Sequence, residues 1–134
     1  MANALYAKGK EKILSASINL PSDTIKASLL SSSYTANLST DEFWSTISAN
    51  LLNTSQTLGS KSVTAGVFDA ADVTFTAVTS GSTVKAVVIW KDTGTPSTSP
   101  LLVYIDTITG FPLATNGGDI QIIWDSGANK IFAL

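Results

Sequence analysis

The chain has no cysteine, no histidine and no arginine among its 134 residues. Histidine performs most proton transfer near neutral pH, and cysteine supplies thiol chemistry. Arginine binds phosphate through two parallel N–H donors of its planar guanidinium group. The eight basic residues are all lysines, scattered among ten acidic residues. Without histidine and cysteine the chain can form neither a histidine-dependent catalytic triad nor a disulfide. Scattered lysines without arginine also make a poor binding surface for the phosphates of nucleic acid. We therefore expect a non-enzymatic protein with no cofactor and no nucleic-acid partner.

Charged residues are also scarce, at 13% of the chain, while hydrophobic residues make up 44% and argue against disorder. The longest strongly apolar run, residues 86–90, is far too short to cross a bilayer. The first residues lack the basic and then apolar layout of a signal peptide. We expect a protein made in the cytoplasm without a membrane partner, forming one domain over residues 1–134.

Two segments have helical periodicity. In residues 1–15 an apolar stripe contains Ala2, Leu5, Tyr6, Gly9 and Ile13, which predicts a short helix that needs a packing partner, either its own domain or a neighbouring subunit. The second helix is predicted over residues 40–49. Its signals are a capping-box pair, Ser39 and Glu42, followed by apolar residues at every fourth position.

The rest of the chain is rich in serine, threonine and β-branched residues arranged in short alternating runs. Residues 84–90 are apolar on both faces in their middle, which predicts a central strand. A turn at residues 125–129 is expected to close a C-terminal hairpin. The pattern predicts a mainly β, single-domain β-sandwich or jelly-roll-like fold with two short helices. The expected strands are residues 24–30, 62–64, 67–68, 73–77, 84–90, 101–106, 120–124 and 130–134.

Some residues suggest chemistry, and each has a simpler structural interpretation. Asp92-Thr93-Gly94 and Asp125-Ser126-Gly127 resemble the loops of an aspartic-protease pair, but Asp-x-Gly is also common turn chemistry. Carboxylates in the loops could converge on calcium, or could simply be loop acids. Five aromatic side chains could form a sugar-stacking platform, although aromatics in small β domains usually lie in the core. The calcium candidates are Asp69, Asp72 and Asp119, and the platform candidates are Tyr34, Trp44, Trp90, Tyr104 and Trp124.

Several segments carry a resemblance to a known family. They are ALY at residues 4–6, GVFDAADVTF at 66–75, VIWKDTGT at 88–95, YIDT at 104–107, NGGDI at 116–120 and WDSGANKIF at 124–132. With these segments the chain resembles small virion structural proteins of tailed phages. It is most similar to capsid decoration, or cement, proteins of short-tailed phages such as those that infect cyanobacteria.

The resemblance implies a β-sandwich that forms a homotrimer on the outer capsid surface and clamps neighbouring copies of the major capsid protein. It implies no catalytic residue and no cofactor. A tail-associated or host-surface glycan-binding module stays open as the alternative. We expect the contacts to come from the N-terminal segment and the loop at residues 93–100, since neither is needed to complete a sandwich. The residues expected at the interface are Leu5, Tyr6, Ile13, Thr95, Pro96 and Pro100.

Overall fold

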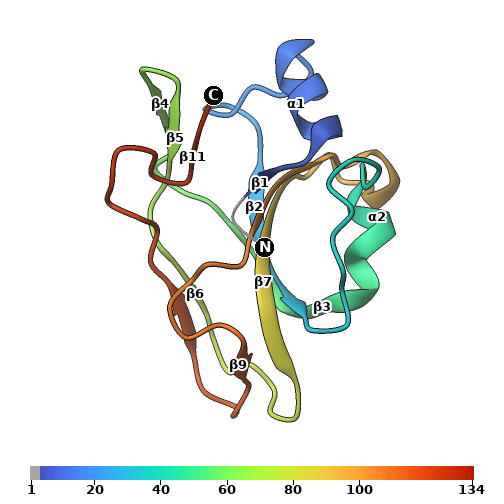
Figure 1. Ribbon diagram of the computed structural model, residues 1–134, viewed down its shortest axis with the longest axis vertical. Helices are drawn as coiled ribbons and strands as arrows, with labels where there is room; N and C mark the ends of the chain where they lie inside the picture. Colours follow the sequence, from blue (N-terminus) through green and yellow to red (C-terminus); the bar gives the residue numbers. More distant parts are fainter. Residues whose placement is uncertain (1–3) are drawn as a thin grey trace.

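The computed structural model describes residues 4–134 and shows a mainly β protein (Figure 1). Strands make up 37% of it and helices 14%, and the sheets are antiparallel. This confirms the predicted fold class and is consistent with a single-domain β-sandwich. Within the described residues, none of the helices has the length and apolar character needed to cross a lipid bilayer.

The largest sheet has β7 (Thr83–Lys91) at its centre, as the sequence predicts. Both faces of this strand are covered, which is why its apolar run is continuous rather than alternating. The strand order is β1 (Ala4–Leu5), β8 (Leu101–Ile105), β7, β2 (Ile25–Ser31) and β3 (Leu51–Thr57), and β9 (Leu113–Ala114) pairs with the start of β7.

One face of this sheet carries the larger core. Val87 and Ile89 of β7 lie on this face with Ile25, Ala27 and Leu29 of β2, which confirms the predicted alternation of β2. Two small sheets cover this face, on the left of Figure 1. They consist of β4 (Ser62–Thr64), β5 (Val67–Asp69) and β11 (Phe132–Ala133), and of β6 (Val73–Phe75) with β10 (Ile120–Ile122).

The opposite face carries a smaller core, covered by the segment that contains α2 (Trp44–Ile47) and the 3₁₀ turn η1 (Ser48–Asn50). The rings of Trp44 and Trp90 stack with centroids 4.5 Å apart and planes 3° from parallel. The indole N–H of Trp90 donates to Ser28 Oγ at 2.8 Å, so this buried donor is paired. A second 3₁₀ turn, η2 (Pro96–Thr98), contacts α2.

The N-terminal helix α1 (Ala7–Leu14) is shorter than predicted, because the residues before it form β1. It packs on its own domain, against β8. Gly9 makes this possible, since a Cβ there would lie 2.4 Å from the carbonyl oxygen of Leu101. Ile13 also contacts the larger core, as the stripe predicts, whereas Ala2 lies outside the described residues.

Two sequence-based predictions are wrong. The second helix begins at Trp44 with Phe43 as its N-cap and no side-chain cap, because Asn37 Oδ1 accepts the N–H groups of Ser39 and Thr40 in a separate turn. The turn at residues 125–129 does not close a hairpin, because β10 pairs with β6 and β11 pairs with β5. Strands β1, β3 and β9 were not expected.

Candidate functional site

Tyr6, one of the six residues expected at an interface, is a buried anchor of the N-terminal segment. Its side chain is 0% exposed, and its hydroxyl lies 2.8 Å from the hydroxyl of Tyr34. Tyr34 in turn donates to Asp41 Oδ2 at 2.8 Å, and the backbone N–H of Tyr6 donates to Leu102 O. The Tyr6 side chain is therefore enclosed by its own chain and offers no surface to a partner.

The loop at residues 93–100 is ordered by its own side chains. Thr93 Oγ1 lies 2.6 Å from Thr98 Oγ1 and 3.1 Å from Ser99 Oγ, and Ser99 is fully buried. This network leaves Thr95 and Pro96 exposed at the tip. Pro100 is buried, so its side chain, like that of Tyr6, is not available to a partner.

The structure brings the two expected contact elements to the same end of the large sheet, at the top of Figure 1. Lys12 of α1 lies 3.4 Å from Glu42 Oε1 and 5.6 Å from the centre of the Phe43 ring. Phe43 forms an isolated β-bridge with Pro100 at the end of the loop. Residues 42–43 therefore connect α1 to the loop.

An apolar area lies at the end of α1. Leu14 is 82% exposed, and Ile13 beside it is half-buried. Ile13 lines an open depression of about 340 Å³ together with Val63, which is 46% exposed. We call this area the α1 surface. It consists of the exposed Leu14 together with the residues that line the depression, of which Ile18 and Leu20 are themselves buried: Ile13, Ala16, Ile18, Asn19, Leu20, Pro21 and Val63.

Only Ile13 of the α1 surface was singled out from the sequence. One signal was available for Leu14, which is an apolar residue off the predicted stripe of α1. Val63 gave no such signal, because its exposure depends on how the hairpin of β4 and β5 lies against the loop after α1. Leu5 is half-buried against the larger core and contributes to the interior more than to this surface.

The candidate catalytic carboxylates occupy turns. Asp92 Oδ1 accepts the N–H of Gly94 and Asp125 Oδ1 accepts that of Gly127, which is the turn chemistry proposed as the simpler interpretation. Asp92 also lies 2.8 Å from Lys26 Nζ. The hydrogen bonds from Lys26 and from the Gly94 N–H lower the pKa of Asp92, so this carboxyl is held ionised rather than sharing a proton.

The three candidate calcium ligands do not converge. Asp72 accepts the backbone N–H of Trp124, and Asp119 accepts that of Ala77, both at 2.9 Å. Across residues 4–134, no group of three or more carboxylates is placed to hold a metal ion. Asp72 and Asp119 therefore act as backbone acceptors that attach loops to β6.

The five aromatic side chains proposed as a sugar platform are buried. Trp44 and Trp90 cover each other's faces, and the indole N–H of Trp124 donates to Ala71 O. Tyr34 and Tyr104 lie in the smaller core. A sugar ring stacks on an open aromatic face, so these residues do not provide the platform.

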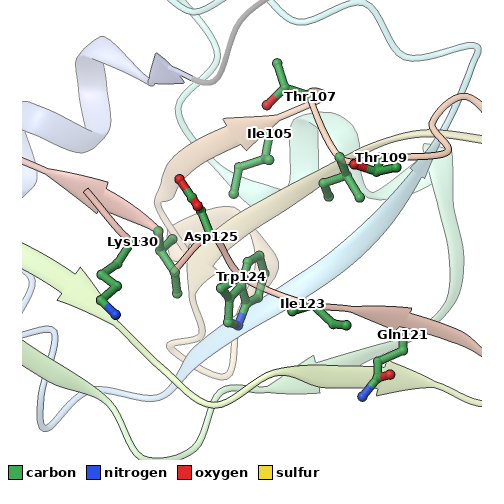
Figure 2. A pocket seen from close by; sticks show the side chains of 10 residues that line it. Ile105, Thr107, Thr109, Gln121, Ile123, Trp124, Asp125 and Lys130 are labelled. Carbon is green, nitrogen blue, oxygen red and sulfur yellow. The ribbon is translucent and has the colours of Figure 1, made fainter. Parts of the chain in front are cut away.

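A hollow of about 520 Å³ lies beside β10. Figure 2 shows Gln121, Ile123, Trp124 and Asp125 along one side of it, with Ile105, Thr107 and Thr109 opposite. Ile108 and Ile131 add apolar surface, and Lys130 stands near one end. We call this hollow the β10 groove.

The depression of the α1 surface has a mainly apolar lining that includes Asn19. The β10 groove combines isoleucines and Trp124 with one acid, one lysine and neutral polar groups. No protein-family model matches the chain, and no curated protein matches it.

Proposed function

We propose that this protein is a capsid decoration protein of a tailed phage. In this proposal it binds as a homotrimer to the outer capsid surface and bridges neighbouring major capsid proteins. The observation that carries the proposal is the α1 surface, where Leu14 and Val63 expose apolar side chains beside a depression. Exposed apolar clusters of this kind are typical of protein contact sites. The resemblance along the whole chain supplies the class of partner.

The proposed mechanism is mechanical. Packaged DNA pushes neighbouring capsid subunits apart, and a protein bound across their junction adds contact area that resists separation. Each contact contributes only the free energy left after the cost of losing translational and side-chain freedom. A trimer presents three linked patches, so that the second and third contacts form at a high effective concentration once the first has formed. A modest affinity of each single contact is then sufficient for stable binding to the capsid.

The test must change the contact surface without changing the fold. Deletion of residues 1–12 is unsuitable, because it removes β1, most of α1 and the buried Tyr6. Leu14→Asp is suitable, since this side chain is 82% exposed. Thr79→Asp, at an exposed position in the loop before β7, is a control with the same charge change.

Light scattering of the free protein and electron microscopy of phage capsids stripped of it measure assembly and decoration. We expect a trimer that re-decorates the capsids. Leu14→Asp should weaken assembly or decoration by about tenfold or more, since burying one leucine contributes about 1.5–3 kcal/mol. Thr79→Asp should behave as the unmodified protein. A monomer that ignores capsids would overturn the proposal, and decoration unaffected by Leu14→Asp would remove the α1 surface from it.

A further inference from the structure

Among the strands of residues 4–134, β10 has only one partner, β6. The paired residues are Ile120 with Phe75, Gln121 with Thr74 and Ile122 with Val73. Exposure continues to alternate past the strand end, because Gln121 and Ile123 are exposed while Ile122 and Trp124 are buried. The backbone is therefore extended through residue 124.

The backbone groups of an extended strand point alternately to its two edges. The N–H of Trp124 donates to Asp72 Oδ1, on the side of β6, so the groups of Ile122 and Ile120 point to that side as well. The N–H and C=O groups of Gln121 and Ile123 consequently point to the opposite edge. Within residues 4–134, no hydrogen bond reaches them from that side.

This free edge borders the β10 groove. Ile105, Ile108 and Ile131 supply apolar surface, while Thr107 and Thr109 lie across from Gln121 and Ile123 (Figure 2). Ile123 is 67% exposed, so its apolar side chain is available to a molecule bound in the groove. The volume of about 520 Å³ lies within the range of ligand sites.

We propose that the β10 groove binds an extended peptide segment of a partner protein, which adds as a new strand to the free edge of β10. Two donors and two acceptors, spaced two residues apart on one line, match the backbone of a strand. The apolar surface accepts side chains at alternate positions of the segment. An uncovered edge is also a hazard in a soluble protein, which favours an occupant.

The charges of the groove define the peptide further. Asp125 and Lys130 both line it, and neither forms an ion pair within the described part of the chain. A segment that carries one basic and one acidic residue next to its apolar positions would complement both. The occupant is therefore an alternating apolar and polar segment with charges of both signs, rather than a purely acidic or purely basic one.

The probe is a display library of eight-residue peptides that alternate apolar and polar positions and carry one lysine and one aspartate. The decisive variant is Ile123→Pro, which removes the outward N–H without touching the bonds to β6. Ile123→Thr is the matched control, because it keeps the N–H and the preference for a strand. Circular dichroism verifies that both variants are folded.

We expect enriched peptides to bind the unmodified protein and Ile123→Thr with affinities that differ by no more than about threefold from each other. Ile123→Pro should weaken binding by about tenfold or more, the worth of one backbone hydrogen bond. In the unmodified protein, the amide protons of Gln121 and Ile123 should become protected from hydrogen exchange when peptide is added. This readout does not depend on a proline variant.

Three outcomes would overturn the inference: no peptide is enriched, enriched peptides bind Ile123→Pro unchanged, or peptide leaves the two amide protons unprotected. Self-association abolished by Ile123→Pro would likewise overturn it, because a second copy would then occupy the edge. Peptide binding in solution requires neither a trimer nor a capsid, so it can succeed or fail independently of the decoration proposal.

Discussion

Tyr6, Tyr34 and Tyr104 are the three tyrosines of the chain, and all of them lie in the smaller core. Burial raises the pKa of each phenol, because the charged phenolate is poorly solvated there. The neighbouring Asp41 further raises the pKa of Tyr34, and Asp106 further raises that of Tyr104. Each phenol is thus held neutral by the folded state.

These shifts predict the behaviour of the protein in alkali. A raised folded-state pKa contributes stability that is fully present below the unfolded pKa, which is about 10, and is lost as the pH rises above it. Absorbance titration of phenolate should therefore show little ionisation near pH 10 while the protein is folded. The signal should appear at higher pH together with the loss of circular dichroism, in one step.

The control for this titration is the same protein in guanidinium chloride, where the three phenols should ionise near pH 10. Gradual ionisation near pH 10 with the circular dichroism unchanged would contradict the buried arrangement of Tyr6, Tyr34 and Tyr104.

The helix α1 shows how a poor helix residue becomes necessary in its tertiary setting. From the sequence, Gly9 weakens a helix that is already short. In the structure it is buried against the backbone of β8, where no side chain fits. Substitution by alanine therefore has two opposing effects on stability. It gains about 1 kcal/mol in helix propensity, and it creates a clash with Leu101 O.

We predict that the clash dominates. Because the Cβ would lie 2.4 Å from a backbone oxygen, α1 must move away from β8. Gly9→Ala should lower the free energy of unfolding by about 1–3 kcal/mol, measured by chemical denaturation. Gly59→Ala is the matched control, since nothing lies within 4 Å of a Cβ at that position. Stabilisation by Gly9→Ala would show that α1 is not held against β8.

The prediction of individual elements succeeded where the apolar pattern is strong and failed where local signals compete or are weak. The alternation of β2 and the apolar run of β7 were sufficient to place both strands. A strand buried on one face alternates apolar and polar residues, and a strand buried on both faces is apolar throughout, so consecutive residues show either pattern directly. The capping pair Ser39 and Glu42 was misleading, since Asn37 takes over the local N–H groups. The alternating signal of Leu51–Thr57 is weak, and β3 was missed.

The two cores lie on opposite faces of the same strands. Phe75 belongs to the larger core and Trp44 to the smaller one, and both pack against the sheet built on β2, β7 and β8. Disruption of either core therefore removes support from strands that the other core needs. The molecule should unfold as one cooperative unit rather than as separate layers.

We predict that Phe75→Ala and Trp44→Ala each lower the free energy of unfolding by about 3–5 kcal/mol. Each variant should still show a single transition, with tryptophan fluorescence and far-ultraviolet circular dichroism changing together. Thr74→Ala, an exposed position between Val73 and Phe75, is a control expected to change the stability little. Two separated transitions in either variant would show that the layers fold independently.

The candidate surfaces depended on tertiary structure in the same way. The expected contact elements, α1 and the loop at residues 93–100, do lie near each other, but two of the six named residues, Tyr6 and Pro100, are enclosed. Leu14 and Ile123, the most exposed large apolar residues of the described structure, were not singled out. Periodicity indicates which residues are apolar, whereas exposure depends on what packs over them.

The amino-acid sequence by itself determined the class of this protein: the strand content, the central position of β7, and a composition without histidine, cysteine or arginine. These properties follow from local alternation and from residue chemistry. Only the tertiary structure decided that β10 pairs with β6 rather than with β11, leaving an edge free beside a groove. Short strands carry too little local information to specify a distant partner, because the choice depends on how all the layers bury their apolar faces together.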